Sequence, residues 1–235
     1  MKIKWVDEYD QRRRKLYRQF VKPSDLVFNV GANVGTRTEI FADLEARVFA
    51  LEPQPELVKR LRERFKDRDN VTIIEAAAGA EMGTVDMLLI RDNDVPLGTC
   101  EPDWIRSIEE KYCQNWPMEK WDSKITVRQI TVDSLVEEYG IPDFIKIDVD
   151  GYERFVLQGL NYKVPAICFE VTIPYGELAF VCVDDLASRL GYTEFNYIVQ
   201  EEAVLVLREW VDAEKMMRIL RRLPQRTFFC DVFAR

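Results

Sequence analysis

Short apolar segments rich in β-branched residues alternate along the chain with segments whose apolar residues recur at helical spacing. The first kind is typical of buried strands, and the second is typical of helices that pack one face on a sheet. In the stretch 55–65, for example, Leu57, Leu61 and Phe65 share one helical face. This alternation predicts an α/β fold, a mostly parallel sheet with crossover helices. The strands predicted in this part of the chain are 26–30, 47–51, 71–74, 82–90, 127–132, 144–149 and 166–171.

The last third of the chain predicts antiparallel strands. Residues 195–199 and 203–207 have the pattern of a hairpin, and 228–234 would close the chain as a final strand. Antiparallel strands at the end of a parallel sheet are common in doubly wound folds. Helices are predicted at 133–140 with Asp133 as the cap and Gly140 near the end, at 152–160, at 177–190 before Gly191, and from Asp212 onward.

The length of 235 residues and the lack of a Ser/Gly/Pro-rich linker predict a single domain over 1–235. Within it, 1–22 is predicted to be an N-terminal helical segment with many basic residues. The stretch 91–124 reads as an insertion that holds three of the five tryptophans, which predicts a cap or acceptor-binding element. Trp104, Ile108 and Tyr112 recur at a spacing of four, however, so a helix packed on the core is an equal alternative.

Charge and residue usage exclude several classes of protein. The net charge of −8 repels a phosphate backbone and argues against a nucleic-acid partner. The chain has no histidine, which excludes Ser-His-Asp and Cys-His sites and every His-ligated metal, and no residue spacing calls for a metal. Five cysteines without a C-x-x-C pair suggest neither a disulfide framework nor a zinc site. Without a long apolar run or a signal-peptide pattern, we expect no membrane partner and a cytoplasmic location.

A glycine-rich turn follows the first predicted strand. Gly31 and Gly35 are its hinges, and Glu52 lies 21 residues beyond Gly31 at the end of the second strand. A carboxylate at that position can accept hydrogen bonds from the hydroxyls of a ribose. Asn33 and Thr36 stand where a dinucleotide-binding turn would have glycine. A nucleoside cofactor without a pyrophosphate fits better, and S-adenosylmethionine is the common one. The start of the next helix, with Thr36 and Thr38, would favour its carboxylate.

Charged residues interrupt a strand that should be apolar. In the segment 144–151, Lys146 and Asp148 fall on one face, although central parallel strands are usually continuous hydrophobic runs. The next strand carries Glu170 near its carboxyl end, where ligands bind in open α/β sheets. We therefore expect Asp148 and Glu170 to point toward the same crevice. The alternative is a buried pair of lysine and carboxylate that only holds the register of the strands.

Three motifs together resemble the FkbM-type methyltransferases: Val-Gly-Ala-Asn-Val-Gly after a strand, Glu-Pro after the next, and Pro-Asp-Phe-Ile-Lys-Ile-Asp-Val-Asp-Gly-Tyr-Glu ending at Glu153. The resemblance runs from about Asp25 to Val171. It implies the class I methyltransferase fold, a Rossmann-like seven-stranded sheet, and O-methyl transfer to a hydroxyl, often on a sugar or a secondary metabolite. Two positions depart from the family pattern. Asn29 and Asp150 stand where the family commonly has Asp and Glu.

The motifs, their spacing and the resemblance predict which residues bind the cofactor and the acceptor. Thr99, in a stretch that resembles the substrate-side loop of the family, and Trp104 are the candidates for the acceptor. Asp148 is a candidate both for the cofactor and for catalysis. The predicted cofactor-binding residues are Asn29, Gly31, Asn33, Gly35, Thr36, Thr38, Glu52, Pro53, Ala76 and Asp148.

The function predicted from the sequence is that of an S-adenosylmethionine-dependent O-methyltransferase. Its acceptor would be a hydroxyl of a small molecule, a sugar or glycan, or a secondary metabolite. An alcohol is a poor nucleophile until it loses its proton, so Asp148 or Glu170 would act as general base, with Lys146 as the orienting partner. Two alternatives stay open: a methyltransferase that acts on RNA or protein, and a cofactor-binding module without catalysis.

Overall fold

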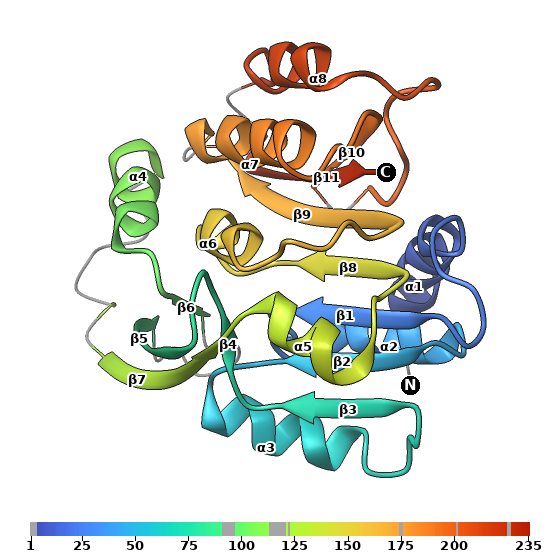
Figure 1. The fold of residues 1–235 in the computed structure, drawn as a ribbon, viewed down its shortest axis with the longest axis vertical. Coiled ribbons are helices and arrows are strands. Elements are labelled where there is room, and N and C mark those ends of the chain that lie inside the picture. The colour runs from blue at the N-terminus through green and yellow to red at the C-terminus, as the bar shows by residue number, and fades with distance from the viewer. Residues whose placement is uncertain are drawn as a thin grey trace.

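The structure is a computed structural model, and it describes residues 4–90, 97–112, 121, 123–173, 176–200, 202–224 and 227–235. Two sheets organise the chain (Figure 1). The larger has seven strands in the order β10-β11-β9-β8-β1-β2-β3. Their bounds are β1 Leu26–Val30, β2 Arg47–Leu51, β3 Val71–Ile74, β8 Phe144–Ile147, β9 Ala166–Thr172, β10 Phe195–Val199 and β11 Phe229–Ala234.

The five strands from β9 to β3 run parallel, and β11 lies antiparallel to both β9 and β10. This confirms the predicted class I methyltransferase arrangement, a mostly parallel seven-stranded sheet with an antiparallel C-terminal strand. The strand order reverses at β1, which has β2 on one side and β8 on the other. The crevice beyond the carboxyl ends of these strands is where open α/β sheets bind their ligands.

Helices cover both faces of the large sheet. One face packs against α5 Val132–Tyr139, α6 Glu153–Gln158, α7 Glu177–Ser188 and α8 Ala213–Leu220. The other face packs against α1 Lys4–Tyr17, α2 Thr36–Asp43 and α3 Pro55–Arg64. Alternation along β1 explains the two cores, because Phe28 and Val30 face the first set of helices while Val27 faces the second.

A smaller four-stranded sheet lies at the carboxyl ends of the parallel strands (Figure 1). Its order is β4-β7-β5-β6, with bounds β4 Ala77–Ala78, β5 Gly83–Ile90, β6 Leu97–Thr99 and β7 Ser123–Ile130. Helix α4, Pro102–Tyr112, follows β6. The segment 91–124 therefore contributes a strand, a helix and the start of β7, which begins before the predicted residue 127. The rest of that segment lies largely outside the described residues.

Two local predictions were wrong. Residues 203–207 do not form a strand of a hairpin, because Ala203 adopts a left-handed φ of 52° and β10 takes β11 as its antiparallel partner instead. Asp133 does not cap α5. The Thr131 side chain accepts the Ser134 amide at 3.1 Å, and Asp133 accepts the Asn161 amide. Asp212, at which a helix was predicted to begin, is the N-cap of α8, and its side chain accepts the Lys215 amide at 2.7 Å. No described helix has both the length and the apolar character needed to cross a membrane.

Candidate functional site

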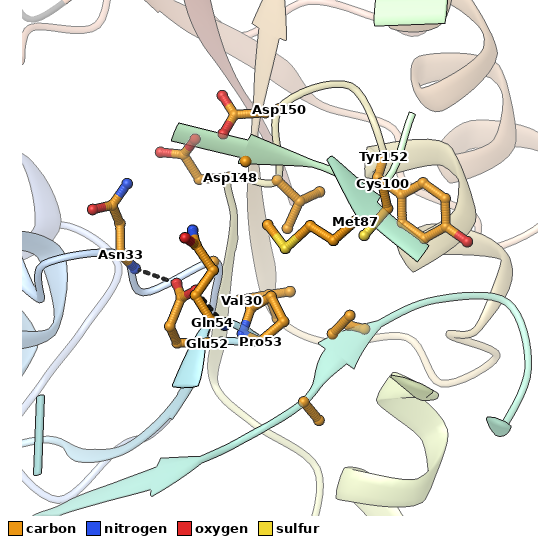
Figure 2. A pocket seen from close by; sticks show the side chains of 16 residues that line it. Val30, Asn33, Glu52, Pro53, Gln54, Met87, Cys100, Asp148, Asp150 and Tyr152 are labelled. Carbon is orange, nitrogen blue, oxygen red and sulfur yellow. Dashed lines mark hydrogen bonds between the residues drawn. The ribbon is translucent and has the colours of Figure 1, made fainter. Parts of the chain in front are cut away.

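A pocket opens at the carboxyl ends of β1, β2 and β8. The turn after β1, the segment after β2 and the segment after β8 form three of its walls (Figure 2). The smaller sheet closes the pocket with Met87 of β5, Gly98 of β6 and Cys100, which follows β6. Its lining is Val30, Gly31, Asn33, Glu52, Pro53, Gln54, Ala76, Ala77, Ala78, Met87, Gly98, Cys100, Asp148, Val149, Asp150 and Tyr152. We call it the cofactor pocket.

The glycine turn places its backbone directly against the segment after β8. Gly31 has a φ of 84°, and a Cβ at this position would lie 1.8 Å from the carbonyl oxygen of Asp148. Gly35, with a φ of 88°, has no space for a Cβ because Leu61 and Phe65 of the α3 region lie 2.7 Å away. Each glycine is therefore required both for its backbone conformation and for close packing.

Glu52 is the buried carboxylate of the pocket. Its Oε2 accepts the Asn33 amide at 2.8 Å and its Oε1 accepts the Gln54 amide at 2.9 Å (Figure 2). Burial raises the pKa of Glu52 to about 7, although the two backbone hydrogen bonds favour the charged form. Each oxygen keeps a lone pair for a further donor, and the small apolar residues Ala76 to Ala78 lie beside it. A carboxylate next to an apolar slot fits a ribose and its base.

The shifted pKa of Glu52 predicts a pH-dependent cofactor affinity. Only the ionised carboxylate accepts hydrogen bonds from two hydroxyls, so affinity is lost as pH falls through the pKa of about 7. Calorimetric titration with S-adenosylhomocysteine should show binding about tenfold weaker at pH 6 than at pH 8. Glu52→Gln should bind weakly at both values. A wild-type affinity that does not change between these two pH values would contradict the role of Glu52.

Three carboxylates gather beside the cofactor pocket, and we call Asp148, Asp150 and Glu170 the acidic cluster. One oxygen of each lies within 4.8 Å of the others. Burial raises the pKa of Asp150 and of Glu170 well above the usual range, and the charge of Asp148 adds to both shifts. The side chains of Asp148 and Glu170 therefore converge, as predicted. Such a cluster could also accept a cation, so the prediction of a metal-free site stays a prediction.

Lys146 lies under the acidic cluster, with none of its side chain exposed. Its Nζ is 3.3 Å from Oδ2 of Asp148 and 3.1 Å from Oδ1 of Asp231 on β11. Burial alone lowers the pKa of Lys146, but the two carboxylates outweigh it and the pKa lies well above its usual value. The sequence reasoning missed Asp231, although a charge within an apolar terminal strand was a usable signal.

The loop 148–151 is held by residues that do not line the pocket. Glu153, at the start of α6, accepts the amides of Val149 at 3.0 Å and Gly151 at 3.4 Å. Burial raises its pKa to about 7. Thr99 donates to the carbonyl of Asp150 at 2.6 Å and accepts the Glu101 amide. These contacts explain the glutamate at 153, and Gly151, with a φ of 98° and the Trp104 side chain against it, has no space for a Cβ.

The candidate acceptor residues Thr99 and Trp104 are both buried. Trp104 donates its indole N–H to Thr172 at 3.0 Å, and its side chain would lie 2.5 Å from a Cβ at Gly151. It packs in a small core with Ile105 and Ile108, as the helix alternative predicts. A direct role of either side chain in binding the acceptor stays a prediction.

Trp104→Ala should therefore act mainly on stability. Removing a buried tryptophan costs about 3–5 kcal/mol of the free energy of unfolding, and chemical denaturation would measure it. Trp104→Phe keeps most of the packing and removes only the hydrogen bond to Thr172, so its loss should be smaller. An unchanged Michaelis constant for the acceptor in the phenylalanine variant would assign Trp104 to the support of the loop, and an increase would assign it to the acceptor.

Some predicted cofactor residues lie outside the lining of the pocket. Asn29 donates to Thr38 at 2.9 Å, and both are buried between the large sheet and α2. Gly35 precedes α2 and Thr36 begins it. These residues lie behind the turn, whereas Gly31, Asn33, Glu52, Pro53, Ala76 and Asp148 line the pocket. That they bind the cofactor stays a prediction. The lining residues that were not predicted are Val30, Gln54, Val149, Asp150 and Tyr152, and those in or next to the smaller sheet, Ala77, Ala78, Met87, Gly98 and Cys100.

Residues 29–223 match the model of the methyltransferase FkbM domain. The chain belongs to this family of methyltransferases, whose cofactor is S-adenosylmethionine. The expected resemblance is therefore confirmed, and Glu52 with its apolar slot is consistent with an adenosine cofactor.

Among characterised proteins, the chain is similar to the hexuronic acid methyltransferase AglP of Haloferax volcanii, with 28% identity over 159 residues. The match covers 67% of this chain and 59% of AglP, so the chain spans less than two thirds of that relative.

Solved structures with a similar chain path include two methyltransferase-fold proteins. The precorrin-6y C5,15-methyltransferase of Geobacter metallireducens has a TM-score of 0.48 and 13% identity over 97% of this chain and 87% of its own. Fibrillarin of Aeropyrum pernix, with natively bound S-adenosyl-L-methionine, has a TM-score of 0.49 and 11% identity over 97% of this chain and 76% of its own.

Proposed function

We propose that this protein is an S-adenosylmethionine-dependent O-methyltransferase that acts on a hydroxyl group of a small molecule, with a sugar or glycan as the first acceptor to consider. One observation carries the proposal: Glu52 and two members of the acidic cluster line the same pocket. Asp148 and Asp150 belong to the lining of the pocket, and Glu170 lies within reach of both. A nucleoside anchor thus lies next to groups that can accept a proton. The hexuronic acid acceptor of the relative AglP supports a sugar.

The chain contributes binding, orientation and a proton acceptor. When bound, S-adenosylmethionine would supply a methyl carbon bonded to a sulfonium sulfur; in-line attack of an oxygen on that carbon would break the carbon–sulfur bond and release the thioether S-adenosylhomocysteine. The ionised Glu52 holds the ribose, which orients the cofactor. Asp148, held by Lys146 at 3.3 Å, accepts the proton of the attacking hydroxyl. Glu170 is the second candidate for this proton.

The two alternative functions are weaker. The net charge of −8 and the acidic cluster at the pocket repel the phosphates of an RNA acceptor. A protein acceptor stays an outcome of the test. A binding module without catalysis would need no group of three crowded carboxylates next to the cofactor, because such a group costs free energy when its members are charged.

Calorimetric titration with S-adenosylhomocysteine tests the cofactor, with NAD as the control ligand. We expect micromolar binding of the first ligand, in the range of about −8 kcal/mol, and none of the second. Transfer is then measured with methyl-labelled S-adenosylmethionine and two acceptors, p-nitrophenyl β-D-glucuronide and p-nitrophenyl β-D-glucoside. Binding without transfer to any hydroxylated acceptor would favour the binding module.

The product distinguishes a hydroxyl acceptor from a carboxyl acceptor. Methylation of a hydroxyl gives an ether, which survives mild alkali, whereas methylation of the glucuronide carboxylate gives an ester, which alkali cleaves. We expect an alkali-stable product, because a carboxylate needs no general base and would be repelled by the acidic cluster. An alkali-labile product would overturn the assignment of a hydroxyl.

A further inference from the structure

The last strand of the large sheet carries a buried charge that the proposed function does not use. Asp231 lies in the middle of β11 with 1% of its surface exposed, and its neighbours Cys230, Val232 and Phe233 are fully buried apolar residues. It lies opposite Glu170 in the antiparallel pair of β11 and β9. Burying a carboxylate is costly unless a charged partner and hydrogen bonds offset the loss of water.

Lys146 is that partner, and it connects Asp231 to the cofactor pocket. The ammonium donates to Oδ1 of Asp231 at 3.1 Å and to the carbonyl of Ile147 at 3.2 Å, and it lies 3.3 Å from Oδ2 of Asp148. These three contacts match its three N–H donors. Asp148 is the member of the group that reaches the pocket, with 27% of its side chain exposed against 2% for Asp231. The ammonium is thus held between a buried carboxylate and a carboxylate in the pocket.

Stability alone gives little reason for this arrangement. A buried ion pair is often replaced by apolar residues of similar volume without loss of stability, because desolvation cancels most of the attraction between the charges. The surroundings would suit such a replacement, since Tyr17 of α1 and Cys168 of β9 are buried on the same face. What the pair does provide is a fixed position for Lys146. With Asp231 removed, Asp148 would be the one carboxylate among the described residues that forms an ion pair with the ammonium, which would draw Asp148 away from the pocket.

We propose that Asp231 is a positioning residue for methyl transfer: it holds Lys146 from the far side, so that Asp148 faces the acceptor. This inference rests on the proposed function. A reacting group must be held within about 0.5 Å of its productive position, and a displacement of about 1 Å can cost a hundredfold in rate. Asp231 does not line the pocket; its side chain accepts a hydrogen bond from Lys146, and its charge also adds to the raised pKa of Glu170 on the paired strand.

The test begins with Asp231→Asn, which keeps the shape of the side chain and removes its charge. Methyl transfer to the two p-nitrophenyl glycosides should have a kcat at least about tenfold lower. The affinity for S-adenosylhomocysteine should be unchanged, because Asp231 does not line the pocket. Asp185→Asn is the matched control, since it removes a carboxylate from a surface pair with Arg189 on α7 and should leave kcat at the wild-type value.

A double variant separates positioning from stability. Lys146→Met with Asp231→Leu replaces the pair by apolar residues of similar volume and should unfold at or above the midpoint of Asp231→Asn in denaturant. We expect its kcat to stay as low as that of Asp231→Asn. Recovery of wild-type kcat in the double variant would show a purely structural pair and would overturn the proposal, as would a wild-type kcat in Asp231→Asn.

Crystal structures of the wild-type protein and Asp231→Asn provide a test that needs no acceptor. The proposal requires the Asp148 carboxylate to move by more than about 0.5 Å toward Lys146 in the variant. An Asp148 that stays in place overturns the proposal, whatever the acceptor. If the wild-type protein binds S-adenosylhomocysteine but methylates neither glycoside, the sugar acceptor is wrong, and this structural comparison still decides the role of Asp231.

Discussion

Asp148→Asn is expected to lower the kcat of methyl transfer about a hundredfold, the scale of a lost general base. The amide keeps the shape of the side chain and its place in the lining of the pocket, but it cannot take a proton from the acceptor. The change leaves the ion pair of Lys146 with Asp231 in place, so the variant should stay folded. Initial rates at saturating acceptor and cofactor measure the effect.

Two comparisons show whether the loss is chemical. The affinity for S-adenosylhomocysteine should fall far less than kcat, because Asp148 is one of many residues that line the pocket. Asp86→Asn serves as the matched control, since Asp86 forms an exposed pair with Lys124 on the smaller sheet. A kcat near that of the wild-type protein in Asp148→Asn would refute the catalytic role and would transfer the role of the base to Glu170.

Glu52→Ala is expected to weaken cofactor binding by more than about tenfold, the loss that goes with two or more hydrogen bonds to a charged group. The substitution removes the acceptor for the cofactor and also leaves the amides of Asn33 and Gln54 without the carboxylate that they contact. Calorimetric titration with S-adenosylhomocysteine at pH 8, where Glu52 is ionised, gives the clearest comparison.

The thermal unfolding midpoint of Glu52→Ala shows whether the substitution also destabilises the turn, because a damaged turn would lower that midpoint. Glu75→Ala is the matched control, because Glu75 follows β3 and forms an exposed pair with Arg62 outside the pocket. The affinity of Glu75→Ala for S-adenosylhomocysteine should equal that of the wild-type protein. Unchanged affinity in Glu52→Ala would remove Glu52 from the site and would leave the glycine turn as the remaining support for a nucleoside.

The elements predicted most accurately from the sequence are those that a local pattern of apolar and polar residues determines. The strands 26–30, 47–51 and 71–74 have the predicted bounds because each is a short apolar run between turn signals. The stretch 203–207 has a similar composition and is not a strand. Its Val204 and Val206 are largely exposed, and the partner that β10 takes comes from 30 residues further along the chain. Strand pairing between distant segments has no local signal, which is why this prediction was wrong.

The residues of the candidate site also fall into two groups: those that local spacing predicts and those that depend on packing between distant segments. Glu52 was predicted from its spacing of 21 residues from Gly31 in the sequence. The convergence of Asp148 and Glu170 was predicted because the carboxyl ends of parallel strands lie at one edge of the sheet. Asn29 shows the limit of this reasoning. It directly precedes the glycine motif, but alternation along β1 turns its side chain toward Thr38 of α2. Met87 and Cys100 reach the pocket only through packing of the smaller sheet, which no spacing in the sequence predicts.

The contact between Gly31 and the carbonyl of Asp148 has a consequence for redesign. The cofactor turn and the loop that carries the acidic cluster touch backbone to backbone, without a side chain between them that could adjust. A change that shifts the loop to admit a larger acceptor would therefore also shift the turn that binds the cofactor. Met87 and Gly98 line the opposite wall on a separate sheet. An engineered change of acceptor should start from that wall, where the shape of the pocket can vary without disturbing the turn.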